Sequence, residues 1–314
     1  MGNEAIVMKN ISKQFKVLNR REGLKGSIRD LFSRDYKIVR AVDDVSLTVN
    51  KGEIVGYLGP NGAGKSTTIK IMTGVLEPSA GEIIVDGRVP YKDRTANSEN
   101  IGVVFGQRSQ LWWNLPLIES FNLLRDIYLV PEKDYRDMLE LYRSLVDLEP
   151  ILHKPVRQMS LGQRTLSDIL AAFLHNPGIV FLDEPTIGLD VSMKARIREL
   201  IRGLNEVKKT TVILTTHDMG DVDALCKRII IIDKGHKIYD TDIEHLKCYF
   251  GSYRTLRMRL GDDSWVEQVI DEKKTDVMHV MQNMQKDHKI KDIQLQEIST
   301  EEVIRKIYEG GQSA

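Results

Sequence analysis

The sequence Gly59-Pro60-Asn61-Gly62-Ala63-Gly64-Lys65-Ser66 decides the fold of this protein. It follows the strand-like run Glu53–Leu58 and precedes the helix-like run Thr67–Met72. Strand, glycine-rich turn and helix, in this order, form the context in which a loop binds phosphate. Glycines let successive backbone N–H groups turn inward around an anion, and the positive end of the following helix points at the same group. In such a loop Lys65 reaches the outer phosphates and Ser66 can ligate Mg²⁺.

Composition limits the classes of protein that fit. The chain has 314 residues, and its 45 lysines and arginines balance its 45 aspartates and glutamates. A chain without net charge has no global field that favours nucleic acid, so we expect no nucleic-acid partner. No apolar run approaches the length that spans a bilayer, and the N-terminus lacks a signal-peptide pattern. The length predicts one large domain with a small addition.

Polar residues follow the buried strands that the pattern predicts. Asp183 and Glu184 come directly after the apolar run at 179–182, and His217 follows the run at 211–216. Polar residues at the carboxyl ends of buried parallel strands mark the ligand-binding edge of an open α/β sheet. Between residues 108 and 178 the pattern turns helical, which predicts a helical subdomain inserted into the α/β core.

Two segments lie outside this pattern. Residues 16–40 form a basic interruption with one apolar helical stripe, and we expect a short amphipathic helix there. Such a helix could contact a membrane surface or a partner, or pack on its own domain. After residue 250 the texture changes, and Ser299–Glu302 forms a capping box before a last helix. Residues 249–314 therefore predict a small C-terminal α+β domain.

Trp112 and Trp113 are adjacent tryptophans just past Gln107. An exposed aromatic pair could line a groove for a partner. Burial in the core is the alternative, and the sequence does not decide between the two.

Five further segments complete a recognisable set: Gln107, Met159–Gln163, Ile179–Glu184, Thr186–Asp190 and His217. In this order and spacing they resemble the Q-loop, signature, Walker B strand, D-loop and switch histidine of the nucleotide-binding subunit of ATP-binding cassette (ABC) transporters. The resemblance covers about residues 5–245. It implies an α/β fold: a P-loop NTPase ABC-type core over residues 1–248 with an inserted helical subdomain, plus the small C-terminal α+β domain.

The resemblance also implies the cofactors ATP and Mg²⁺ and the roles of the site residues. Glu184 would be the general base, His217 would contact the γ-phosphate, and Lys65 would neutralise phosphate charge. Mg²⁺ would be held by Ser66, Gln107 and, through water, Asp183; Gln107 would also sense the nucleotide. The remaining expected ATP contacts are Gly59, Pro60, Asn61, Gly62, Ala63, Gly64, Thr67, Ser160, Gly162 and Gln163.

Three positions depart from the family pattern or leave it ambiguous. Met159 replaces a leucine of the signature, a swap that conserves size and polarity. Leu161 replaces a signature glycine and removes backbone freedom. For the aromatic residue that stacks on adenine we favour Tyr36, which stands five residues before Ala41. Phe15 is the alternative, because the interruption at 16–40 breaks the spacing.

The resemblance implies how such a subunit works. Two copies would close head to tail around two ATP molecules, and a separate transmembrane permease subunit would supply the pore. The C-terminal domain and the insertion resemble those of bacterial exporter ATPases, so export is expected, from a peripheral position on the cytoplasmic face of the membrane. The alternative is a non-transport ABC ATPase that acts on the ribosome or on nucleic acid.

Overall fold

The computed structural model describes residues 3–18, 36–106, 109–249, 251, 253–287 and 289–310. The chain forms two compact units, Met1–Asp240 and Thr241–Ala314. The change in sequence pattern predicts a domain boundary at residue 248, but the two units divide between Asp240 and Thr241. The physical reason is that helix α10 (Ile243–Tyr249) contacts the final helix α12 (Thr300–Gly310) and therefore belongs to the second unit.

A six-stranded sheet forms the centre of the first unit, in the order β5-β6-β7-β3-β8-β9. Its strands are β3 (Ile54–Leu58), β5 (Ile101–Phe105), β6 (Ile179–Asp183), β7 (Thr211–Thr215), β8 (Arg228–Asp233) and β9 (His236–Asp242). The pairs β5–β6, β6–β7, β7–β3 and β3–β8 are parallel. Every residue of β7 is buried, as expected for a parallel strand covered on both faces.

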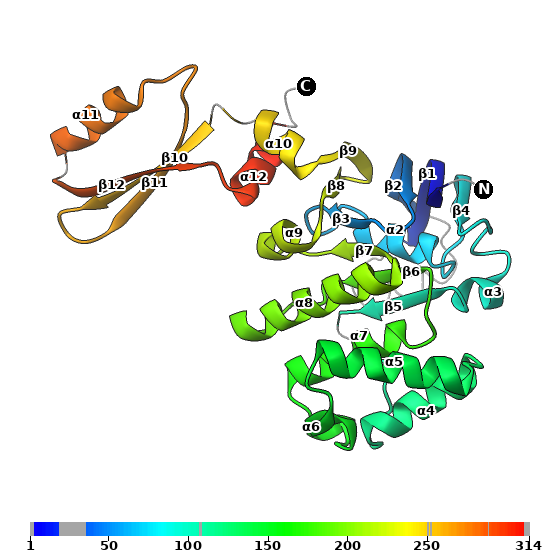
Figure 1. The fold of residues 1–314 in the computed structure, drawn as a ribbon. Helices are drawn as coiled ribbons and strands as arrows, with labels where there is room; N and C mark the ends of the chain where they lie inside the picture. Colours follow the sequence, from blue (N-terminus) through cyan, green and yellow to red (C-terminus); the bar gives the residue numbers. More distant parts are fainter. Residues whose placement is uncertain are drawn as a thin grey trace, which may run out of the picture. The chain divides into compact units, whose positions relative to one another are not determined.

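A second, antiparallel sheet has the order β2-β1-β4. Its strands are β1 (Glu4–Leu18), β2 (Tyr36–Asn50) and β4 (Ala80–Val85). Helix α2 (Lys65–Met72) lies between the two sheets (Figure 1). Its residues Ile69, Ile71 and Met72 share one buried cluster with residues of both sheets. The helix that follows the phosphate loop is thus fixed by apolar packing on two sides.

Helices gather at the end of this unit away from the antiparallel sheet (Figure 1). They are α4 (Leu117–Ile127), α5 (Glu132–Leu145), α6 (Glu149–Leu152) and α7 (Leu161–Phe173). The Tyr142 hydroxyl donates to the Leu170 carbonyl at 2.6 Å and joins α5 to α7 in the interior. The inserted helical subdomain expected from the sequence is confirmed. The described part of this unit also contains α3 (Arg94–Ser98), α8 (Val191–Lys208) and α9 (Met219–Leu225).

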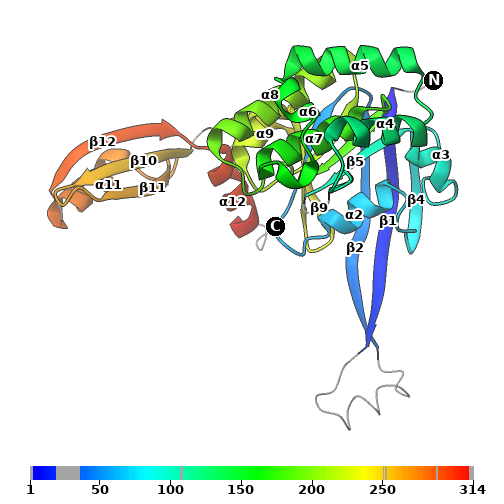
Figure 2. The ribbon, with the colours of Figure 1, turned by 90° about the horizontal axis from the view of Figure 1, so that it is seen from below.

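Strands β1 and β2 extend as a two-stranded ribbon beyond the third strand of their sheet (Figure 2). They pair as far as Leu18 with Tyr36, whereas β4 pairs with β1 only as far as Ser12. The sequence interpretation of 16–40 as one interruption was therefore too broad, because residues 16–18 and 36–40 are strand. The amphipathic helix predicted inside this segment falls within 19–35, outside the described residues.

The second unit has its own sheet, in the order β11-β10-β12. Its strands are β10 (Tyr253–Leu260), β11 (Trp265–Asp271) and β12 (Ile290–Glu297). Leu256, Met258 and Ile270 form its core, and Met281 and Met284 of helix α11 (Val277–Asp287) pack against them. Within the described parts of both units, no helix combines the length and the apolar character needed to cross a membrane.

Candidate nucleotide site

The parallel register brings three predicted segments to one edge of the central sheet. Strands β6, β7 and β3 are neighbours, and Asp183 lies beside Thr215 in the register. The phosphate loop follows β3, Asp183 and Glu184 end β6, and His217 follows β7. Because parallel strands all end at the same edge, these side chains converge there. Gln107 follows β5 but lies outside the described residues, so its expected place at the metal stays a prediction.

The phosphate loop has the backbone shape that an anion needs. Gly62 and Gly64 have φ of +82° and +105°, which residues with a Cβ atom rarely adopt. A Cβ atom on Gly64 would also lie 2.3 Å from the Ala41 carbonyl oxygen. Helix α2 begins at Lys65, and no side chain caps its N-terminus. The loop and the first helical turn therefore present backbone N–H groups that fit a phosphate.

Lys65 lies within this loop and near the acidic residues. Its ammonium donates to the carbonyls of Gly59 at 2.5 Å and Pro60 at 3.2 Å. Burial lowers the pKa of Lys65, and the charges of Glu184 and Asp183 oppose that shift. The phosphate loop and the ends of β6 and β7 lie at one edge of the sheet, so the charges of Lys65 and the two carboxylates act on one another there.

Asp183 and Glu184 are held by Thr215, which the sequence analysis did not single out. The Thr215 hydroxyl donates to Asp183 Oδ1 at 2.5 Å, and the Glu184 N–H donates to the Thr215 carbonyl at 2.9 Å. Glu184 has a φ of +54°, a conformation that costs a residue with a side chain about 1–3 kcal/mol. A residue held in such a conformation needs surrounding hydrogen bonds, and Thr215 supplies them.

Glu184 and His217 contact each other directly at the edge of the sheet. His217 Nε2 lies 2.7 Å from Glu184 Oε1, and both side chains remain partly exposed. Ser66, in the first turn of α2, and Asp183 supply hydroxyl and carboxylate oxygens, which are the ligands that Mg²⁺ prefers. The donor set therefore fits a magnesium ion bound together with phosphate.

The signature segment opens helix α7. Ser160 Oγ accepts from the Gln163 N–H at 3.2 Å, and Gln163 Oε1 accepts from the Ser160 N–H at 3.2 Å, which is a capping box. Gly162 is buried, and a Cβ atom there would lie 2.5 Å from Met193 Cγ. Within the described part of this chain, no hydrogen bond joins Ser160, Gly162 or Gln163 to the phosphate loop. The side chain of Gln163 caps its own helix.

Phe15 lies on the face of the ribbon that covers the phosphate loop. Val42 pairs with Lys13 in the register, and Val42 Cγ2 lies 3.6 Å from the position of a Cβ atom on Gly64. Directly opposed residues share a face, so Lys13 is on that side. The register shifts between Lys13 and Gln14, but the extra residue is Ala41 of β2, so alternation along β1 continues and Phe15 shares the face of Lys13. The Lys13 ammonium lies 5.5 Å from the centre of the Phe15 ring, which agrees with this placement.

Tyr36 lies on the other face. Val39 pairs with Phe15, and Tyr36 is three residues from Val39 in a stretch without register shifts. Alternation along the strand therefore turns Tyr36 away from the phosphate loop. Tyr36 is also five residues from Ala41, or roughly 16 Å along a strand. The register favours Phe15, the alternative of the sequence analysis, over Tyr36.

Asp168 anchors the segment after Gln107 and was missed from the sequence. Its Oδ1 atom accepts from Ser109 Oγ at 2.9 Å and from the Gln110 N–H at 3.1 Å. Burial raises the pKa of Asp168 to about 6, although these hydrogen bonds oppose the shift. An aspartate inside the run 166–174, in which all other residues except Ser167 are apolar, was the only local sign in the sequence.

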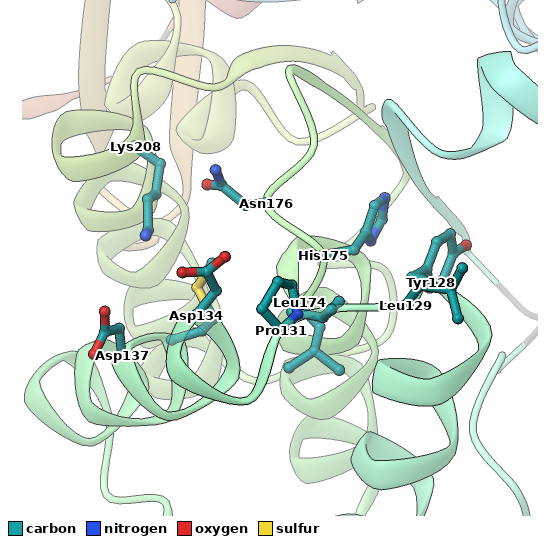
Figure 3. A pocket seen from close by; sticks show the side chains of 11 residues that line it. Tyr128, Leu129, Pro131, Asp134, Asp137, Leu174, His175, Asn176 and Lys208 are labelled. Carbon is teal, nitrogen blue, oxygen red and sulfur yellow. The ribbon is translucent and has the colours of Figure 1, made fainter.

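A separate pocket of about 330 Å³ lies between the helices of this unit (Figure 3). The ring of Tyr128 stacks on that of His175 at its edge, with 3.9 Å between ring centres. Burial lowers the pKa of His175 to about 4. None of the residues predicted for the nucleotide site lines this pocket.

This fold and this site together define a P-loop ATPase with an inserted helical subdomain. Residues 42–187 match the family described as ABC transporter, and residues 153–223 match one described as AAA domain, putative AbiEii toxin, Type IV TA system. The ABC transporter ATP-binding protein NatA of Bacillus subtilis (strain 168) is 36% identical over 215 residues, which cover 68% of this chain and 87% of NatA. The chain belongs to the ATP-binding subunits of ABC transporters, which are ATPases.

Longer relatives and solved structures agree with this assignment. The human Cholesterol transporter ABCA5 is 31% identical over 87% of this chain, but the match spans only 16% of that protein. A dimeric structure of the ATP-binding cassette MJ0796, bound to ADP and Pi, superposes with a TM-score of 0.61 at 27% identity, covering 76% of this chain and 98% of that one.

Replacing Asp168 by Asn tests the buried carboxyl that accepts hydrogen bonds from Ser109 and Gln110. Because the folded pKa of about 6 lies above the ordinary 3.8, the protonated carboxyl stabilises the fold below about pH 4, and this contribution is lost as the pH rises through 6. The free energy of unfolding of the parent therefore falls as the pH rises, by at most about 3 kcal/mol, whereas Asp168→Asn has no carboxyl to titrate at this position. We expect the difference in this free energy, variant minus parent, to rise by the same amount. Chemical denaturation at stepped pH measures it. For the control Asp137→Asn, at an exposed position, the difference in unfolding free energy should not change with pH. A difference that is also independent of pH for Asp168→Asn would contradict the raised pKa of Asp168.

Proposed function

We propose that this ATPase drives export of a substrate through a separate transmembrane protein, with ATP closing two copies of the chain and hydrolysis releasing them. The observation that carries the catalytic part is the 2.7 Å contact between Glu184 and His217, beside Lys65 and Asp183 at one sheet edge. A base, a group that orients it, a lysine and a metal-binding carboxylate are what phosphoryl transfer to water requires.

Each residue then has a chemical role. Lys65 and the loop N–H groups bind the β- and γ-phosphates and neutralise charge that grows in the transition state. Ser66 and Gln107 would hold Mg²⁺ directly and Asp183 would hold it through water, and the ion would supply further positive charge to the phosphates. Glu184 accepts a proton from the attacking water, and His217 keeps the carboxylate and the γ-phosphate in place.

A second copy of the chain would complete the site. Ser160 and Leu161 are exposed at the start of α7, where the first-turn N–H groups and the helix dipole favour an anion. In the proposed dimer Ser160 and Gly162 of one copy face the γ-phosphate bound by the other. The dimeric form of the MJ0796 cassette supports this arrangement. Loss of the γ-phosphate would then weaken the contact between copies.

The membrane partner would bind near the exposed tryptophans. Trp112 and Trp113 are 38% and 50% exposed, and the Arg164 guanidinium lies 4.6 Å from the Trp113 ring centre. Exposed tryptophans beside an arginine are typical of protein interfaces. Asp168 fixes the segment between this surface and Gln107, so docking and nucleotide sensing would share one short stretch.

Export is favoured by the C-terminal α+β unit and the β1–β2 insertion; a non-transport ABC ATPase is the second candidate.

Replacing Glu184 by Gln tests the general base. The amide cannot accept the proton, so we expect ATP hydrolysis to fall by about 10²- to 10⁴-fold. The amide keeps the shape of the side chain, so ATP should still drive dimerisation, measured by gel filtration with and without ATP. Glu140→Gln, at an exposed position of α5, is the matched control. Normal turnover in Glu184→Gln would eliminate Glu184 as the base.

Replacing Phe15 by Ala tests the adenine contact. Stacking on an aromatic ring is worth about 1–3 kcal/mol per base, so ATP affinity should fall by about 5- to 150-fold. Phe15→Tyr should keep the affinity, and Tyr36→Ala should leave it near the parent value. Titration of a fluorescent ATP analogue measures all three variants. A loss in Tyr36→Ala with none in Phe15→Ala would restore the original expectation.

Purification of the tagged full chain from native membranes in mild detergent tests the transporter assignment. We expect a polytopic membrane protein in stoichiometric amount, and we expect Trp112→Ala with Trp113→Ala to reduce its recovery. Trp265→Ala in the C-terminal unit is the matched aromatic control. Recovery with ribosomes or nucleic acid, and without a membrane protein, would support the non-transport alternative instead.

A further inference from the structure

Asp221 of α9 is a fully buried carboxylate outside the proposed catalytic set, with an exposed fraction of 0%. Its Oδ1 atom accepts from Arg198 Nε of α8 at 2.7 Å. Its Oδ2 atom accepts from the hydroxyl of Thr216 at 2.9 Å and also from that of Thr186. A buried charge is costly unless it is paired, so these contacts explain how the carboxylate is tolerated.

The two threonines locate the turns that carry the catalytic pair. Thr186 lies two residues after Glu184, and Thr216 directly precedes His217. Both threonines are buried, whereas Glu184 and His217 remain partly exposed. The Oδ2 atom of Asp221 therefore joins the turn after β6 to the turn after β7 in the protein interior. The 2.7 Å contact of Glu184 with His217 joins the same two turns where the side chains are partly exposed.

We infer that Asp221 is a positioning residue for ATP hydrolysis: it fixes the spacing of the Glu184 and His217 turns through the hydroxyls of Thr186 and Thr216. The inference rests on the roles proposed above for Glu184 and His217. These side chains leave their strands on separate loops, and Glu184 has a strained φ of +54°. A misplacement of about 1 Å at such a site can cost about 10²-fold in rate, so the spacing needs a fixed link.

Among the described residues, no hydrogen bond joins the phosphate loop to Asp221, Thr186 or Thr216. The hydrogen bonds of Asp221 reach α8 and the two turns. The Lys65 ammonium instead bonds to carbonyls of its own loop, and the Ala63 carbonyl accepts from the Gly235 N–H after β8. The expected effect is therefore on turnover and not on nucleotide binding. A purely structural role would instead lower stability and impair both together.

Removing each hydroxyl tests the inference without removing the buried charge. Thr186→Val and Thr216→Val keep the side-chain shape, and we expect each to lower kcat about 10- to 100-fold. KM for ATP and the affinity for an ATP analogue should stay at the parent values. Thr186→Ser and Thr216→Ser retain the hydroxyl and should restore most of kcat. Assays run well below the measured Tm of each variant.

Asp218→Asn is the matched control. The Asp218 side chain also contacts Arg198, at 3.2 Å, and pairs with Lys194 at 2.5 Å, but it accepts no bond from the two hydroxyls. Its backbone N–H donates to the Thr216 hydroxyl at 3.0 Å, and Asp218→Asn keeps that bond. We expect kcat near the parent value in this variant and a large loss in Asp221→Asn. Parent kcat in both valine variants would overturn the inference, as would serine variants no better than the valine ones. Normal turnover in Glu184→Gln would instead overturn the proposed catalytic role, so the two failures are distinguishable.

Discussion

The site depends on one constraint, which is that strands β6, β7 and β3 are neighbours in a parallel sheet. Parallel strands deliver the loops that follow them to the same edge, whatever the distance along the chain. The phosphate loop and His217 are about 150 residues apart in sequence, yet the pairing of β3 with β7 places their strands side by side. Packing of apolar side chains on both faces fixes this register, so the hydrophobic core determines where the site residues lie.

The charges at that edge of the sheet oppose one another only in part. Lys65 is buried, and the charges of Asp183 and Glu184 favour its protonated form against the cost of burial. Two acids and one lysine leave an excess of negative charge, which a divalent cation would compensate when phosphate binds. The positive φ of Glu184, the proposed general base, persists because the hydrogen bonds to Thr215 enforce this conformation.

Local patterns explain what the sequence could predict. The phosphate loop, the buried strands at Ile179–Asp183 and Thr211–Thr215 and the capping box at Ser299 each have a signal within a few residues. The choice between Phe15 and Tyr36 has none, because it depends on the pairing of β1 with β2 across an interruption. The roles of Thr215 and Asp221 could not be predicted either, because each depends on hydrogen-bond partners that the local sequence does not identify.

Leu161 shows how the structure accommodates a departure that the sequence alone marks as a concern. It is the first residue of α7, and its φ is not positive, so this position does not need glycine. The capping box of Ser160 and Gln163 holds the helix start without it. The Leu161 side chain is half exposed and lies over Gly188, with Cδ2 3.4 Å from the position of a Cβ atom there. At the neighbouring Gly162 a Cβ atom would displace the Met193 side chain, so packing favours glycine at that position and not at 161.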